Sequence, residues 1–250
     1  MKNTKTYLIS VIIGLITSCS QAPEKYEEGL KNLNEKNWEQ ALDCFNQITT
    51  ENNEWLDSAN LQKSRVLQDV IAAEQWEKLV KIVGKNDASL KPVAKMNLIS
   101  FFENNVKKNG SIKAINILDN NKSILDTLLD SITKKKIMTK IEDNYFLGVW
   151  KGSKEADGCD IVFERKDNQL SGNSTVNFGF WKKNDVIFKN LNYENGQEWN
   201  MEQRIFRYNK NTGDMVTIYY EKNGKIKIIS SDSIYTESKV SKAYFIRKKP

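Results

Sequence analysis

Hydrophobic residues follow two different patterns along the chain. From Pro23 to Ile141 they recur every three or four positions, the spacing that places them on one face of an α-helix. From Tyr145 onward they form short alternating runs rich in aromatic residues, which is the pattern of half-buried β-strands. The sequence therefore predicts an α+β protein of two domains, a helical domain over residues 19–143 and a strand domain over residues 145–250.

Three stretches of the helical part share a common pattern. Trp38 is followed by Ala41 and Phe45 on one apolar stripe, and Gly29 lies twelve residues before Ala41. Positions 41, 79 and 114 mark equivalent points of the three stretches, 38 and 35 residues apart. The arrangement resembles tetratricopeptide repeats, which pair two helices over about 34 residues and carry an A-x3-F signature in the second helix.

This resemblance implies stacked helical hairpins whose concave face binds a peptide or a partner protein. The later units depart from the repeat, because Leu79 replaces the alanine and neither unit keeps the glycine, although Ala114 precedes Leu118 in the third. The alternative is an ordinary helical bundle without a binding groove. Trp38 and Trp76 fall on the buried stripe, so we expect them to be packing anchors rather than ligand contacts.

About eight short strands are expected after Tyr145, at the spacing of an antiparallel meander. Turn signals separate most of them, and the strongest is Asn223-Gly224, which predicts a tight hairpin. Such strands form a sandwich or a barrel, and a barrel leaves no exposed edge. The expected strands are Phe146–Gly152, Asp160–Arg165, Leu170–Phe178, Asp185–Asn190, Trp199–Tyr208, Met215–Glu221, Lys225–Ser230 and Lys242–Arg247.

Gly148-Val149-Trp150 resembles the G-x-W motif near the first strand of lipocalins. In that family an arginine near the end of the last strand packs over the tryptophan in a cation–π contact, and Arg247 lies at the corresponding place. The resemblance implies a compact lipocalin-like barrel that Trp150 and Arg247 close. The family's long first loop is missing, since few residues separate Trp150 from the second expected strand.

A lipocalin-like barrel could hold a small apolar molecule among inward-pointing aromatic side chains. Alternation along a strand sends only about half of the candidates inside. The other interpretation, which we favour, is that these aromatic side chains fill the core of the barrel. The candidates are Phe178, Phe180, Trp181, Trp199, Phe206, Tyr208, Tyr219 and Tyr220.

The N-terminus has the pattern of a secretory signal. Lys2 and Lys5 precede an apolar run over residues 7–16, which is about half the length needed to span a bilayer. Residues 16–19, Ile-Thr-Ser-Cys, resemble the lipobox of bacterial lipoproteins. The resemblance implies that residues 1–18 are removed and that Cys19 carries acyl chains, which attach the chain to a membrane.

The lipobox also implies a location. The chain would lie on the extracytoplasmic side of the cell envelope, and the outer membrane is favoured because Ser20 is not the aspartate that resembles an inner-membrane retention signal. The alternative is an ordinary signal peptide with an incidental cysteine at its end.

The composition argues against an enzyme, a metal site or a cofactor. The chain has no histidine, which removes the commonest general base and zinc ligand. Besides Cys19 only Cys44 and Cys159 remain, one in each domain, and free thiols are expected there although an exported protein could form a disulfide. No carboxylates form a recognisable catalytic pair among Glu164, Asp167, Asp185, Glu198 and Glu202.

The net charge of the chain says little about its function. Loss of Lys2 and Lys5 lowers the net charge from +6 to +4, and the excess of Lys and Arg lies in the strand domain, where it could favour anionic headgroups. Nucleic acid is not an expected partner, because no basic cluster is interleaved with aromatics. We therefore expect an envelope lipoprotein that binds a partner protein through its helical repeats. Transport of a small apolar molecule in the barrel is the alternative.

Overall fold

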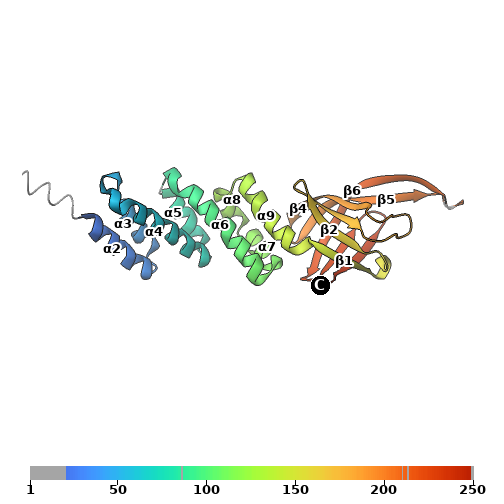
Figure 1. Cartoon of the computed structure of the whole chain (residues 1–250), viewed down its shortest axis with the longest axis horizontal. Coiled ribbons are helices and arrows are strands. Elements are labelled where there is room, and N and C mark those ends of the chain that lie inside the picture. The colour runs from blue at the N-terminus through green and yellow to red at the C-terminus, as the bar shows by residue number, and fades with distance from the viewer. Residues whose placement is uncertain (1–20, 86, 210, 213, 249–250) are drawn as a thin grey trace, which may run out of the picture. The chain divides into compact units, whose positions relative to one another are not determined.

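The computed structural model describes residues 21–248 apart from residues 86, 210 and 213, and the expected signal over residues 1–18 and Cys19 lie outside this part (Figure 1). The described residues form eight α-helices followed by eight β-strands, which confirms the predicted α+β order. The helices are α2 (Gln21–Asn34), α3 (Trp38–Asn46), α4 (Asn53–Ala72), α5 (Trp76–Lys85), α6 (Asp87–Asn109), α7 (Ser111–Asn120), α8 (Lys122–Leu128) and α9 (Ser131–Phe146).

The chain divides into two compact units. The first comprises the described residues up to Phe101 together with Ser123–Leu129, and the second comprises Phe102–Lys122 and the described residues from Asp130 onward. Helix α6 therefore passes from one unit into the other. Helices α7 and α9 belong to the same unit as the strands, so this unit is larger than its strands alone.

The first two helical hairpins have the same turn. Lys36 between α2 and α3 has a φ of 61°, and Glu74 between α4 and α5 has a φ of 53°. In each turn three successive N–H groups, beginning at Glu35 and at Ala73, bond to carbonyls four, three and five residues earlier. The backbone thus repeats at a spacing of 38 residues, because these bonds satisfy the last carbonyls of the first helix in the same way.

Close packing within the first hairpin depends on a glycine. Ala41 and Phe45 of α3 are fully buried. A Cβ atom added at Gly29 of α2 would lie 2.5 Å from Phe45 Cε1, so only glycine lets the ring approach the helix this closely.

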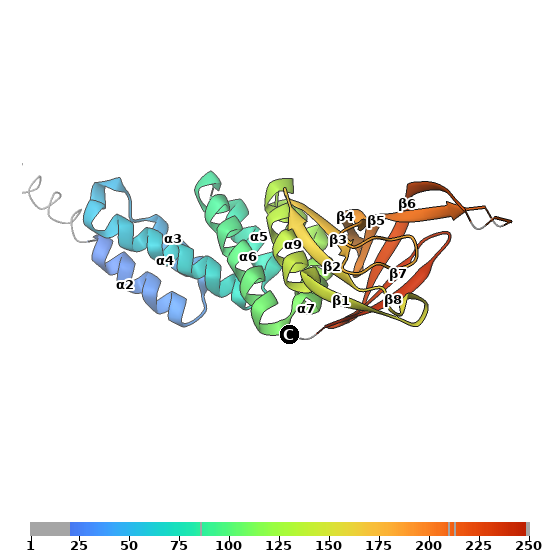
Figure 2. The same ribbon diagram turned by 45° about the vertical axis from the view of Figure 1, so that its right-hand side comes forward.

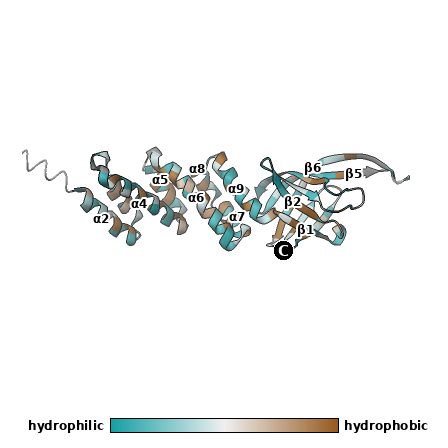
Figure 3. Ribbon diagram, in the orientation of Figure 1, coloured by the Kyte–Doolittle hydropathy of each residue, from teal (hydrophilic) through white to brown (hydrophobic). Residues whose placement is uncertain are grey.

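The strands form a closed antiparallel barrel in which each strand pairs with its neighbour in sequence and the last pairs with the first. This up-and-down order is one that lipocalins also have, and closure leaves no free edge. Apolar and polar residues alternate along the strands in Figure 3, as one buried face requires. The strands are β1 (Gly148–Ser153), β2 (Ile161–Lys166), β3 (Gln169–Ser174), β4 (Val186–Asn195), β5 (Glu198–Tyr208), β6 (Met215–Ser230), β7 (Ser233–Glu237) and β8 (Lys242–Arg247), with short 3-10 turns at Thr50–Asn52 and Lys154–Ala156.

The prediction of a tight hairpin at Asn223-Gly224 is wrong. Residues 215–230 form the single strand β6, and the pairing of β5 with β6 shifts between Met201 and Gln203, where β6 has one extra residue. Asn-Gly suits such a bulge as well as a tight turn, and the chain reverses only after Ser230. The strand Ser233–Glu237 was therefore missed.

A further difference lies at the start of the barrel. Phe146 ends helix α9 instead of beginning a strand, and β1 starts at Gly148, which has a φ of 118°. The change from helix to strand is thus made within two residues.

Candidate functional site

The interior of the barrel next to α9 is filled by aromatic side chains. Phe146 at the end of α9 lies 5.2 Å from Phe163 and 5.0 Å from Trp199, measured between ring centroids. All of the aromatic side chains in this group are at most 1% exposed, and they come from α9 and five of the strands. The group consists of Phe146 of α9 together with Trp150 of β1, Phe163 of β2, Phe188 of β4, Trp199 of β5 and Phe245 of β8.

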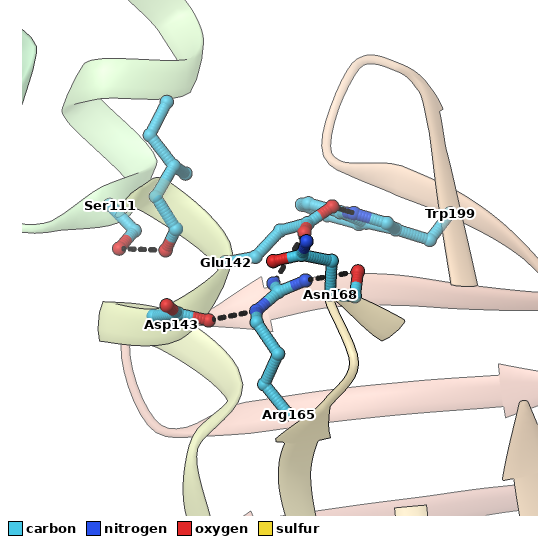
Figure 4. Close-up of polar contacts among 7 residues, drawn as sticks. Ser111, Glu142, Asp143, Arg165, Asn168 and Trp199 are labelled. Carbon is cyan, nitrogen blue, oxygen red and sulfur yellow. Dashed lines mark hydrogen bonds and ion pairs between the residues drawn. The ribbon is translucent and has the colours of Figure 1, made fainter. Parts of the chain in front are cut away.

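A buried polar network ties α9 to the barrel (Figure 4). Glu142 is 8% exposed, and its Oε1 accepts a hydrogen bond from Trp199 Nε1 at 3.0 Å. Its Oε2 accepts one from Arg165 Nη2 at 2.8 Å, while Arg165 Nε donates to Asp143 Oδ1 at 2.5 Å. Because Arg165 also donates to the carbonyl of Asn168 at 3.2 Å, its guanidinium is shared among three acceptors. The network links α9 to β2 and β5. Each of its charged groups is bonded to another residue of the network.

Trp150 and Arg247 are paired on the neighbouring strands β1 and β8, next to the C-terminus of α9. The guanidinium carbon of Arg247 is 4.9 Å from the centroid of the Trp150 ring and 5.5 Å from that of Tyr145. Trp150 Nε1 donates to the carbonyl of Phe146 at 2.8 Å, and Arg247 Nη1 and Nη2 both lie 3.3 Å from the carbonyl of Asn144. Both side chains therefore satisfy carbonyls at the C-terminus of α9, where a cation also interacts favourably with the helix dipole.

Replacing Arg247 with Ala is expected to destabilise the barrel unit by about 1–2 kcal/mol, because the cation–π contact and the bonds to Asn144 are both lost. Chemical denaturation followed by near-ultraviolet circular dichroism measures the loss. Arg247→Lys keeps the charge but not the planar fork, so it should recover only part of the stability. An unchanged unfolding midpoint for Arg247→Ala would show that the contact contributes nothing.

Helix α7 is bound to the turn between β4 and β5. Asp119 accepts hydrogen bonds from the Tyr193 hydroxyl and, at 3.0 Å, from the N–H of Gly196. Gln197 Nε2 donates to Asn116 Oδ1 at 3.1 Å. Burial, together with the neighbouring Asp119 carboxylate, raises the pKa of Tyr193 above its ordinary value. The hydroxyl therefore stays protonated and acts as a donor that holds α7 in place.

The other aromatic side chains that were candidates for the interior are mostly elsewhere. Trp199 is fully buried inside, whereas Phe206 alternates with the buried Ile205 and so lies on the outer face of β5. Phe180 and Trp181 pack against Phe206 at centroid distances of 5.7 and 6.1 Å. Phe178 contacts Trp181, and the Tyr220 hydroxyl donates to the carbonyl of Val186. Tyr219 is 37% exposed. The side chain of Tyr208 is outside the described part of the chain.

Four of the five carboxylates noted in the sequence are bound by cations or amides. Asp185 accepts from Arg204, and the Lys182 N–H is the main cause of its lowered pKa. Lys227 holds the pKa of Glu198 below its ordinary value, and Asn190 with Lys189 does the same for Glu202. Asn173 donates to Glu164, and Asp167 lies in the turn after β2 with a φ of 50°. No two of these carboxylates are paired with each other in the described contacts.

Cys44 and Cys159 are both free and buried. Burial raises the pKa of the Cys159 thiol to about 12 and also raises that of Cys44. Among the described residues no three His, Cys, Asp or Glu side chains are grouped as a metal site, and none of the described helices is long and apolar enough to cross a membrane.

The sequence reasoning missed Glu142 and Arg165, although both leave a signal. Arg165 follows Ile161 and Phe163 at alternate positions of one strand, which places a cation on the apolar face. Glu142 adjoins Ile141 on the apolar stripe of the last helix. A charge of each sign on two faces that must be buried is the pattern that predicts an internal ion pair.

In comparisons with known proteins, no protein-family model, no curated protein and no solved structure matches the chain.

Proposed function

We propose that this chain is a lipid-anchored protein of the cell envelope whose helical hairpins bind a partner protein. The observation that carries the proposal is the repetition of the α2–α3 turn in the α4–α5 turn, residue for residue, 38 positions later. In repeat proteins of this kind neighbouring hairpins stack, and the stack forms an extended surface that can bind a partner. Tetratricopeptide repeats have this arrangement, and the packing of Gly29 on Phe45 supports the likeness.

Polar contacts between successive hairpins support stacking. Gln62 of α4 donates to the hydroxyl of Tyr26 in α2 at 3.2 Å, and Asn97 of α6 donates to the carbonyl of Ser64 in α4 at 3.2 Å. The second helices are linked as well, because Glu39 of α3 pairs with Lys81 of α5 at 3.0 Å. Equivalent helices of neighbouring hairpins therefore lie next to each other.

Two exposed apolar side chains suggest where a partner binds. Leu61 in α4 and Met96 in α6 are each 68% exposed, although both recur with other apolar residues at helical spacing in the sequence. They are 35 residues apart, the same as the spacing between the second and third units. Both lie on first helices, so a partner that presents apolar side chains could contact them in sequence.

Photo-crosslinking tests this binding surface. Benzoylphenylalanine at position 61 or 96 of the full chain in its native cells should give a crosslinked product of discrete mass. The same group at Ile229, an apolar residue of β6 that is 57% exposed, should not. Leu61→Glu combined with a crosslinker at position 96 should abolish the product without changing the melting temperature. Equal products at all three positions would contradict the proposal.

In this proposal the barrel is lipocalin-like. Its interior is filled by aromatic side chains, which favours a structural role over transport of an apolar molecule. The rings of Trp150, Phe163 and Phe188 occupy the space that a carrier would offer to its ligand. An apolar ligand carrier thus remains the second candidate, and it gains no support from these contacts.

Thiol labelling tests the anchor. The chain has three cysteines, and acylation of Cys19 would leave two, both of them buried. We expect chain purified from membranes to show no reactive thiol when folded and two in denaturant. Because Cys44 and Cys159 have raised pKa values, their thiolate forms are scarce in the folded protein. One reactive thiol in the folded chain and three in denaturant would contradict acylation, and Cys19→Ala should release the chain from the membrane.

A further inference from the structure

Strands β5 and β6 carry a buried carboxylate on the inner face of the barrel wall. Gln203 and Glu221 are directly opposite each other in this antiparallel pair, so their side chains point to the same side. Gln203 is 3% exposed, and its amide bonds to Ser241 Oγ at 2.9 and 3.1 Å. Glu221 is 9% exposed and therefore lies inside with Gln203.

The Glu221 carboxylate has an unsatisfied oxygen. Its Oε2 is buried and has no hydrogen-bond partner among the described residues, in contrast to Glu142, whose two oxygens both accept bonds. A buried carboxylate oxygen without a partner has lost its hydration, and no hydrogen bond replaces it.

Glu221 lies where a hairpin leaves the barrel. The pairing of β6 with β7 ends at Lys225, whereas its pairing with β5 continues to Tyr208 and Met215 (Figure 2). Tyr219 is two residues from Glu221 on the same face of β6 and is 37% exposed. The inner face of β6 is therefore in contact with solvent at Tyr219, two residues from the buried carboxylate.

We propose that Glu221 is the counter-ion for a small ligand that carries a protonated primary amine. An ammonium group supplies both the positive charge and the N–H donors that Oε2 lacks, and the ring of Tyr219 attracts a cation. A divalent metal ion fits less well, since it needs about six oxygen ligands and the described residues hold no group of three His, Cys, Asp or Glu side chains. An anion is repelled by the carboxylate.

Calorimetric titration of the full chain in non-ionic detergent with n-butylammonium tests the site. The wild type should bind one equivalent saturably, and Glu221→Gln should weaken binding at least about tenfold, the loss expected for a charged hydrogen bond. n-Butanol has no charge and tetramethylammonium has no N–H donor, so both should bind much more weakly than n-butylammonium. Tyr219→Leu should weaken binding by a smaller factor.

Glu202→Gln is the matched control, because Glu202 is on the outer face of the same strand pair and is bound to Lys189 and Asn190. It should bind n-butylammonium like the wild type. Glu221→Gln is isosteric and removes an unpaired charge, so it should melt no lower than the wild type, which separates loss of binding from loss of folding. Equal affinity in Glu221→Gln and the wild type, or no saturable binding of n-butylammonium to the wild type, would overturn the proposal.

Discussion

Arg165→Met is expected to lower the free energy of unfolding of the barrel unit by about 3–5 kcal/mol, the loss typical of breaking one side of a buried ion pair. Arg165 and Glu142 side chains are 14% and 10% exposed, so the remaining Glu142 carboxylate would stay buried without its cation. Asp143 would lose the same partner. Denaturant unfolding followed by tryptophan fluorescence measures the effect, because Trp199 is bound to Glu142.

Two controls separate the buried charge from the contact itself. In Arg165→Met with Glu142→Gln the charge is gone while the amide oxygen still accepts from Trp199, so most of the lost stability should return. Lys189→Met breaks an ion pair with Glu202 whose side chains are 37% and 21% exposed, and it should change stability by less than about 1 kcal/mol. Losses of equal size in all three variants would show that burial of the pair is unimportant.

Gly29→Ala is expected to destabilise the helical unit by about 1–3 kcal/mol, although alanine is the better helix former. The new Cβ would lie 2.5 Å from a carbon of the fully buried Phe45 ring, so α2 and α3 would have to separate. The thermal transition followed by circular dichroism at the helical band measures the loss.

Gly84→Ala is the matched control in α5. A Cβ atom at Gly84 meets no atom within 4 Å, so this variant should be stabilised by up to about 1 kcal/mol through helix propensity alone. Phe45→Leu in the Gly29→Ala background should relieve part of the clash. If both alanine variants were stabilised, the close approach of α2 to Phe45 would be ruled out.

The site was only partly predictable from the sequence. The aromatic residues of the barrel were recognised as a group, but the side of the wall on which each lies depended on strand register, and Phe206 and Trp199 lie on opposite sides. Leu61 and Met96 fit helical stripes yet are exposed, because spacing within one helix does not say how many neighbours cover it. Glu221 was not predicted as a site residue. Its burial follows from its pairing with Gln203, which the sequence does not give.

The sequence alone determined that helices are followed by strands, that the change between them falls near Tyr145, and that the helical stretches recur at spacings of 38 and 35 residues. These follow from local periodicity, which the chain carries wherever it folds. The tertiary structure decided that β1 pairs with β8, that a bulge rather than a hairpin precedes Gly224, and that Glu142 meets Arg165. Such features join residues far apart in sequence, and the free energy that selects them comes from closing the sheet and pairing buried charges rather than from any local preference.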